Sequence, residues 1–440
     1  MTTFQLGRSG AEDLDAADPL AGFRDRFVRE DPSLIYLDGN SLGPLPRATQ
    51  ARIAEVVGQE WGAGLVRSWH RWIGLPGQVG DLLGEHLVGA APGQVAVCDS
   101  TTVNLYKLAC AALDARPGRS VIVTDDDNFP TDRYVLQGIA AQRGGELRMI
   151  GTDLDQGLAT DALRGAVDER TALVSLSHVA YRSGALADMA AITGIVHEAG
   201  ALVLWDLCHS AGAVPVELDA SGADLAVGCT YKYLNAGPGA PAFLYVRREL
   251  QQALRQPVWG WFGQRDQFDM GPAYQPAPGV GQFLTGTPQI IGTVAVQEGV
   301  RLLGEAGIGR LRAKGVALTG YLIGLADAWL APHGVTVASP RPAARRGAHV
   351  TLAHPEAWRI GQALIGQGVI GDYRTPDRLR LGPAPVFTRF TDVWDALDIL
   401  RRIMTDQTYL NVPAARSAGG VSIASSVELS LMCQPCCQPS

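Results

Sequence analysis

ALVLWDLCHSAGAVPVELDASGADLAVGCTYKYLNAGPGAPAFLYV, residues 201–246, is the stretch that decides the fold. It holds three short apolar runs, 201–205, 224–229 and 240–246, each bounded by glycine, proline or polar residues. Runs of this length and composition are typical of buried strands in an α/β sheet. Asp206 ends the first run, and Lys232 follows the second. Because open α/β sheets bind ligands beyond the carboxyl ends of their strands, we expect this carboxylate and this amine to face one crevice.

An acid and a lysine in these places suit the chemistry of pyridoxal phosphate. That cofactor needs a lysine to form a Schiff base and an acid to keep its pyridine nitrogen protonated. We predict Lys232 for the first role and Asp206 for the second. Taken alone, Asp206 is equally well explained as a helix cap and Lys232 as a surface charge. Together, and with Tyr231 and the flexible run 235–239 beside the lysine, they favour a catalytic site.

The bulk properties of the chain exclude several classes of protein. With 440 residues the chain is long for a single core, so we expect two lobes. A net charge of −7 argues against a nucleic-acid or anionic-membrane partner. The apolar stretches are too short to span a bilayer, and the first residues do not resemble a secretory signal. Four cysteines lie in or beside apolar runs, and we expect them to be buried thiols of a cytoplasmic protein: Cys98, Cys110, Cys208 and Cys229.

The order of elements predicts four parts. From Gln94 onward, strands alternate with helices, which indicates a parallel, right-handed α/β sheet. A Gly/Pro-rich segment with tryptophans follows Val246, then helices over 292–330 and a small mixed sheet. We therefore expect an N-terminal segment (1–65) that joins the small domain, a large domain (66–295), a small α+β domain (296–411) and a flexible tail (412–440). The tail holds Cys433, Cys436 and Cys437 without a fourth ligand, so we predict no metal site.

Further candidates come from single patterns. Hydroxyls open a predicted helix at 100–102 and would suit a cofactor phosphate, although plain N-capping explains them equally well. Phe129 is placed to lie on an aromatic cofactor ring, with Asp132 near it. Asn40 and Ser41 belong to a Gly/Pro turn on which we expect both to be exposed. Arg380, on the last predicted strand, is a candidate clamp for a carboxylate.

Seven blocks of the sequence resemble one family. They are YLDGNSLGPLP, CDSTTVNLYK, NFPTD, WDLCHSAG, GCTYKYLNAGPG, GWFGQRDQF and GDYRTPDRLRLGP, and they run in the family's order from about residue 35 to 390. The sequence is similar to the kynureninases, pyridoxal phosphate enzymes of fold type I in the aspartate aminotransferase superfamily. The resemblance implies a large domain with a mainly parallel seven-stranded sheet, a smaller α+β domain, and a homodimer with active sites at the subunit interface.

The resemblance also implies roles for single residues. Lys232, Tyr231 and Asp206 would be catalytic. Cofactor-binding positions would be Thr101, Thr102, Phe129, Asp132, Ser177, Asp206, His209, Tyr231, Lys232, Trp261 and Thr287, the last two lent to the other subunit. Substrate-binding positions would be Arg380, which takes the α-carboxylate, and Trp69, Ser41, Gly286 and Thr287 near the aromatic end.

The family reaction is hydrolysis of L-kynurenine to anthranilate and L-alanine, in tryptophan catabolism and NAD biosynthesis. Two places depart from the family pattern: Gln264, where bacterial relatives often have histidine, and LGPAPVF after Arg380. Both lie near the substrate end, so a ring-substituted kynurenine stays open as the substrate. A second fold-type I reaction, that of a cysteine desulfurase, needs a nucleophilic cysteine on a mobile loop. The later lobe offers none before Cys433.

Overall fold

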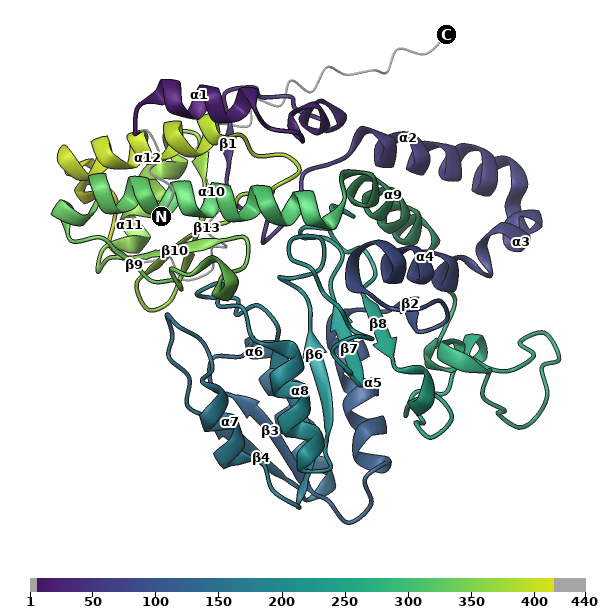
Figure 1. The fold of residues 1–440 in the computed structure, drawn as a ribbon. Coiled ribbons are helices and arrows are strands. Elements are labelled where there is room, and N and C mark those ends of the chain that lie inside the picture. Colours follow the sequence, from purple (N-terminus) through teal and green to yellow (C-terminus); the bar gives the residue numbers. More distant parts are fainter. Residues whose placement is uncertain (1–5, 415–440) are drawn as a thin grey trace, which may run out of the picture.

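The computed structural model describes residues 6–414, which form two lobes, the larger of them built around a seven-stranded sheet (Figure 1). The predicted tail and its cysteines lie outside the described residues. Seven strands form the sheet in the order β2-β8-β7-β6-β5-β3-β4. Their bounds are β2 Val95–Val97, β3 Val121–Asp125, β4 Glu146–Ile150, β5 Thr171–Ser177, β6 Leu202–Asp206, β7 Leu225–Gly228 and β8 Phe243–Val246. Of these seven strands, β8 alone runs opposite to the other six, so the prediction of a mainly parallel seven-stranded sheet is confirmed.

Alternate residues of each central strand face opposite layers of helices, as the two-residue period of a strand requires. On β6, Val203 and Trp205 join the core that includes α8 (Met189–Glu198). Leu202 and Leu204 join the core that includes α5 (Thr101–Asp114) and α6 (Pro130–Arg143). A shorter helix, α7 (Thr160–Ala166), packs beside α8. Both faces of the sheet are therefore covered, and its strands read as continuous apolar runs for that reason.

The small lobe has its own core. Its sheet has the order β12-β13-β10-β9, with β9 Thr336–Val337, β10 Val350–Ala353, β12 Asp372–Arg374 and β13 Arg378–Leu381. All neighbours in it are antiparallel, which corrects the expected mixed sheet, because β12 and β13 form a hairpin. Two helices pack on this sheet, α10 Ile308–Trp329 and α11 Ala357–Ile365; α12 Phe390–Thr405 packs on both of them, and α1 Arg8–Ala16 packs on α12. A parallel pair, β1 Ile35–Tyr36 with β11 Val369–Ile370, ties the N-terminal segment to this lobe.

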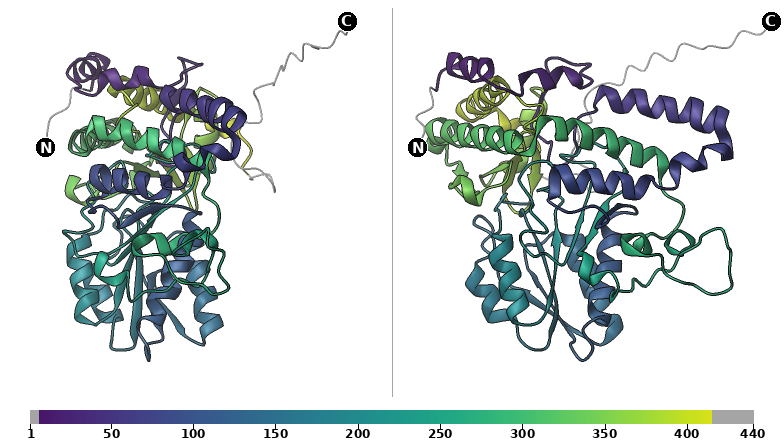
Figure 2. Two further views of the ribbon diagram at one scale, coloured as in Figure 1. Left: turned by 90° about the vertical axis from the view of Figure 1, so that its right-hand side faces the viewer. Right: turned by 45° about the vertical axis from the view of Figure 1, so that its right-hand side comes forward.

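The remaining elements bridge the lobes. They are α2 Arg47–Glu55, a π-helical continuation at Val56–Gly64, α3 Trp69–Trp72, α4 Leu75–Leu83 and α9 Ile290–Ala306. The segment 247–289 leaves the sheet after β8 and extends to one side of the large lobe before α9 begins (Figure 2). The predicted boundary at 295–296 falls inside α9, and the domain limits stay predictions.

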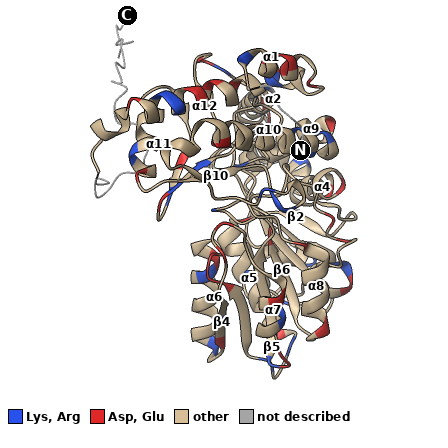
Figure 3. Ribbon diagram, turned by 60° about the vertical axis from the view of Figure 1, so that its left-hand side comes forward, with Lys and Arg blue, Asp and Glu red and all other residues tan. Residues whose placement is uncertain are grey.

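Basic and acidic residues are interspersed along the ribbon of both lobes (Figure 3). This mixed distribution agrees with an ordinary globular surface, without a block of like charge. Across residues 6–414, none of the helices combines the length and the apolar character that crossing a bilayer requires.

Candidate active site

Lys232 lies in the loop after β7 and its side chain is buried. Its Nζ is 3.2 Å from His209 Nε2. The same nitrogen lies 5.8 Å from the ring centroid of Phe129 and 5.9 Å from that of Tyr231. Asn235 adopts a positive φ of 57° in the turn that follows, a conformation that asparagine tolerates better than most residues. The loop therefore holds the amine among three aromatic rings, with its nitrogen free to react.

Two carboxylates share the floor of this cavity. Asp206 ends β6, and one of its oxygens accepts a hydrogen bond of 2.7 Å from the backbone N–H of Cys208. Asp132, in the first turn of α6, is almost fully buried. Burial, with the nearby charge of Asp206 as the next cause, raises the pKa of Asp132 well above its usual value. Asp132 is therefore the carboxyl for which burial favours the protonated form.

The start of α5 forms the opposite wall. Ser100 caps the helix, with the N–H of Val103 donating to its Oγ at 3.3 Å, so the capping interpretation holds for this residue. Thr101 and Thr102 lie in the first turn, where backbone N–H groups and the helix dipole favour an anion. The cavity between these walls has a volume of about 180 Å³ and is lined by Ser100, Thr101, Thr102, Phe129, Thr131, Asp132, Asp206, Cys208, His209, Tyr231 and Lys232.

The side chains next to the lysine are held neutral by burial. Burial, and then the charge of Lys232, lowers the pKa of His209 well below its usual value. Burial, and then Cys229, raises the pKa of Tyr231, which keeps the phenol protonated. The neutral His209 can therefore accept a hydrogen bond from the Lys232 amine, and the neutral phenol of Tyr231 can donate one. Cys208, which we did not predict to be a site residue, lies on the cavity wall, with its Sγ 3.8 Å from Thr101 Oγ1.

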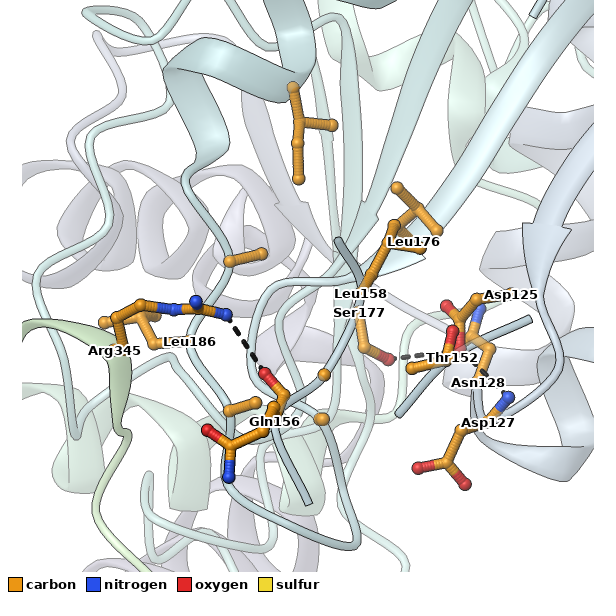
Figure 4. Close-up of a pocket in the computed structure, with 15 residues that line it drawn as sticks. Asp125, Asp127, Asn128, Thr152, Gln156, Leu158, Leu176, Ser177, Leu186 and Arg345 are labelled. Carbon is orange, nitrogen blue, oxygen red and sulfur yellow. Dashed lines mark hydrogen bonds between the residues drawn. The ribbon is translucent and has the colours of Figure 1, made fainter. Parts of the chain in front are cut away.

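Ser177 lies behind this cavity, on the wall of a neighbouring small pocket (Figure 4). Its Oγ donates a 2.7 Å hydrogen bond to Asn128 Oδ1. The backbone N–H of Phe129 donates to the same oxygen at 2.8 Å. Ser177 thus acts on the cavity through Asn128, whose Oδ1 also holds the backbone N–H of Phe129. Asn128 was missed as a candidate, although it is the first letter of the NFPTD block.

Arg380 lies on β13 of the small lobe and is almost fully buried. Its Nε and one terminal nitrogen contact the two oxygens of Asp372 at 2.9 and 2.6 Å. It also donates to the backbone oxygen of Tyr181 at 2.6 Å and to Ser41 Oγ at 2.8 Å. The guanidinium is thus fixed in the plane that a carboxylate clamp requires, with Asp372 as the residue that orients it.

The turn that carries Ser41 packs against the lysine loop. The backbone N–H of Gly43 donates to the carbonyl of Tyr231 at 2.8 Å, and a Cβ at Gly43 would lie 2.2 Å from the carbonyl of Lys232. Ser41 is partly exposed, but Asn40 is fully buried against Arg380, so the expectation that both are exposed is wrong for Asn40. The small lobe covers the turn, which its sequence alone does not show.

Four predicted residues lie away from the Lys232 cavity and do not line it. Trp69 contacts Trp261 and Phe262, with ring centroids 6.2 and 6.1 Å apart. Trp261 lies on the segment 247–289, as do Gly286 and Thr287. The structure of one chain therefore brings most of the cofactor candidates together around Lys232, but the cofactor candidates Trp261 and Thr287 and the substrate candidates Trp69 and Gly286 do not line this cavity.

Comparison with known proteins identifies the family. Kynureninase of Burkholderia pseudomallei (strain K96243) is 46% identical over 410 residues, which cover 91% of this chain and 96% of that protein. Kynureninase of Pseudomonas fluorescens is 45% identical over 404 residues, or 90% and 95% of the two chains. The chain belongs to the kynureninase family. Family models add a kynureninase C-terminal domain over residues 311–400 and the DegT/DnrJ/EryC1/StrS aminotransferase family over 86–219.

Solved structures agree on the fold. C-DES, in a mutant with glycine covalently linked to its pyridoxal phosphate, is 20% identical with a TM-score of 0.75, covering 84% of this chain and 97% of that one. A cysteine desulfurase from Thermococcus onnurineus NA1 is 18% identical with a TM-score of 0.72, covering 92% and 100%. The fold is that of the fold-type I pyridoxal phosphate enzymes, as predicted.

The residues present fit pyridoxal phosphate as the cofactor. A buried amine, an ionisable carboxylate at a strand end and a helix start with free N–H groups surround one cavity. These are the three groups that an aldehyde, a pyridinium nitrogen and a phosphate need. A member of the kynureninase family with this site is a pyridoxal phosphate-dependent hydrolase that acts on a carbon–carbon bond.

Proposed function

We propose that this protein hydrolyses the Cβ–Cγ bond of L-kynurenine, or of a ring-substituted kynurenine, to L-alanine and anthranilate or its analogue. The observation that carries the proposal is the placement of Arg380, fixed by Asp372, on the lobe that closes over the Lys232 loop. An α-amino acid substrate needs its carboxylate held beside the reactive amine. In this proposal the Arg380 guanidinium holds the carboxylate and Lys232 supplies the amine.

Each residue near Lys232 has a task in this proposal. Pyridoxal phosphate supplies the electron sink that stabilises charge on the substrate carbons. The Lys232 amine takes and returns the α-proton. Asp206 keeps a positive charge on the ring nitrogen, and Tyr231 returns a proton to the β-carbon, since burial keeps its phenol protonated. We assign phosphate binding to Thr101, Thr102 and Tyr231, and ring stacking to Phe129.

A homodimer with active sites at the subunit interface is part of the same proposal. Trp261 and Thr287 lie on a segment that does not reach the Lys232 cavity of its own chain. Apolar side chains on and beside this segment are strongly exposed, among them Val66 (73%), Met270 (71%) and Trp259 (64%). Gathered apolar exposure of this kind marks an interface. We infer that a second copy covers it and receives Trp261 and Thr287 at its own site.

A mixed dimer tests the shared site. Co-expressed Lys232→Ala and Trp261→Ala chains form hybrids in which one site has an intact Lys232 and, from the partner, an intact Trp261. We expect each homodimer to be impaired, each hybrid to have one intact site of its two, and the co-expressed mixture therefore to recover up to about a quarter of the wild-type sites by random pairing. Hybrids with no more activity than the mixed homodimers contradict the shared site and leave the reaction itself unaffected.

The chemistry is tested by product formation. The purified protein, loaded with pyridoxal phosphate, is mixed with kynurenine, 3-hydroxykynurenine and ring-methylated kynurenines, and the fluorescence of the released anthranilate is followed. We expect release from at least one member of this panel, with one alanine per aromatic product. A loaded protein that releases no aromatic amine from any of them overturns the proposal. The preferred member also resolves the question raised by Gln264, whose amide oxygen here accepts from the backbone N–H of Gln275 at 2.6 Å.

A cysteine desulfurase is the second candidate, because solved structures of that class share the fold. It needs an ionised thiol at the substrate. Within residues 6–414, the thiol that lines the cavity is Cys208, and its hydrogen bond with Cys229 together with burial raises its pKa well above the usual value. We therefore expect no sulfide from cysteine, and sulfide release at a rate above that of anthranilate would favour this class instead.

The cellular setting follows as a proposal. The reaction belongs to tryptophan catabolism and NAD biosynthesis, and we propose a cytoplasmic location. The described cysteines, Cys98, Cys110, Cys208 and Cys229, are all free thiols, which suits a reducing compartment.

A further inference from the structure

His349 is a fully buried histidine that none of the roles above uses. It precedes β10, and neither of its ring nitrogens has a hydrogen-bond partner among the described side chains and backbone. Buried polar atoms nearly always have such a partner, so an imidazole with two free nitrogens in a packed interior calls for an explanation.

The register of the small sheet directs this ring towards the active site. Thr351 pairs with Arg380 across β10 and β13, so their side chains share a face of the sheet. His349 is two residues before Thr351 and shares that face as well. Its ring centroid lies 5.7 Å from that of His209, whose Nε2 contacts the Lys232 amine. His349 is thus the next polar group behind His209.

The ring has little freedom to move. Gly184, with a φ of 74°, packs against it, and a Cβ at Gly184 would lie 2.8 Å from the His349 carbonyl oxygen and 3.1 Å from Nε2. The N–H of Gly347 donates to the carbonyl of Gly184 at 2.7 Å and closes the loop on that side. A pinned imidazole presents its nitrogens in fixed directions, as a residue that orients a neighbour must.

The charges around His349 keep it neutral. Lys232, Arg380 and Arg374 are the charged groups that act on it, and all three are cations. Burial, followed by these charges, lowers the pKa of His349 well below its usual value. The other titratable side chains here are His209, also neutral, and the protonated phenol of Tyr233. A neutral imidazole offers one N–H donor and one acceptor nitrogen, whereas an imidazolium offers donors alone.

We propose that His349 is a positioning residue for His209. In this proposal one water bridges the two rings, whose centroids lie 5.7 Å apart. Through that water, His349 selects the tautomer of His209 that presents an acceptor Nε2 to the Lys232 amine. No bond is made or broken at His349 itself. The inference rests on the proposed function, since it concerns the same lysine.

The test compares two substitutions at position 349. His349→Phe keeps an aromatic ring of similar size and removes both nitrogens, whereas His349→Gln restores a donor and an acceptor. For each variant loaded with pyridoxal phosphate, we measure the pH titration of the cofactor absorbance band, and kcat and KM for kynurenine. His178→Phe is the matched control, because His178 is also buried with an unpartnered Nδ1 but packs on Trp205.

We expect His349→Phe to shift the midpoint of the absorbance titration by about 0.5 to 1 pH unit, the size of one lost hydrogen bond. The value of kcat should fall about tenfold, with KM changed less than about threefold, since the substrate clamp is untouched. His349→Gln should recover most of both effects, and His178→Phe should leave the midpoint in place. An unchanged midpoint in His349→Phe, or equal effects of Phe and Gln, overturns the inference. A wild-type protein that shows no cofactor band refutes the proposed function instead.

Discussion

Around Lys232, polar side chains contact one another within a single chain, whereas the aromatic cluster around Trp261 lies next to exposed apolar residues. The lysine amine contacts His209, and Asp206 accepts from the Cys208 backbone. The aromatic cluster of Trp69, Trp261 and Phe262 instead continues into strongly exposed apolar residues. The first region is formed within one chain, and we propose that the second is completed by another molecule. In that case the cofactor end of the site depends on the fold of one chain, and the aromatic end on the assembly.

The largest effect on activity is expected in the region around Lys232. Lys232→Ala should abolish the cofactor absorbance band and lower kcat/KM by on the order of 10⁴-fold or more, because the amine that binds the cofactor also moves the proton. Lys314→Met is the control: this lysine is equally buried and pairs with Asp18 at 2.6 Å, far from the cavity. Absorbance spectra and kynurenine turnover measure both. A Lys232→Ala protein that keeps the band would place the cofactor on another residue.

The region around Lys232 was also the part of the site that the sequence could predict. Asp206 and Lys232 were found because strand ends meet at one edge of a parallel sheet, so local patterns locate them in space. Thr101 and Thr102 follow from the same logic at a helix start. The apolar runs 201–205 and 240–246 became β6 and β8 for the reason given, burial on both faces.

What the sequence could not predict depends on how the lobes meet. Asn40 was expected on the surface and is buried, because the small lobe closes over its turn. His349 carries no local signal: its place beside His209 follows from the pairing of β10 with β13, which joins residues about thirty positions apart. Asp372 lies in a block that resembles the family, but only the hairpin β12–β13 shows that it orients Arg380.

The next largest effect is expected on substitution of Arg380. Arg380→Lys should raise KM about 10- to 100-fold with a smaller change in kcat, because an ammonium cannot reproduce the two parallel hydrogen bonds of a guanidinium. Arg378→Lys is the matched control on the same strand, since Arg378 pairs with Asp155 at 2.6 Å, on the other side of the lobe interface. Steady-state kinetics with kynurenine separate the two. Equal effects of both variants would contradict a clamp at Arg380.

In the segment around Trp261, the expected effect is on the association of two chains into a dimer. Met270→Ser should weaken the dimer about tenfold, because it removes an apolar side chain that is 71% exposed in the single chain and that a partner would bury. Leu410→Ser, at an exposed leucine of the small lobe, should leave association unchanged. Sedimentation equilibrium over a range of concentrations measures both. If Met270→Ser leaves the dimer intact, this part of the segment lies outside the interface.

The smallest effect is a dependence on pH set by Asp38, which lies behind the clamp. Burial, followed by the charge of Asp372, raises its pKa to about 7. Its folded-state pKa is above the usual 3.8, so its contribution to stability is present at low pH and is lost as pH rises from about 4 to 7. Asp38→Asn cannot ionise and avoids this loss.

We therefore expect the melting temperature of Asp38→Asn to exceed that of the wild type by roughly 2 to 5 °C above pH 7, and the difference to shrink as pH falls towards 4. KM for kynurenine should also rise through pH 7 in the wild type and not in the variant, because an ionised Asp38 adds a negative charge close to Arg380 and opposes a second carboxylate there. Melting curves and KM at matched pH values check both. A difference in melting temperature that stays constant between pH 4 and 8 would show that Asp38 does not titrate in this range, and the clamp would then depend on Asp372 alone.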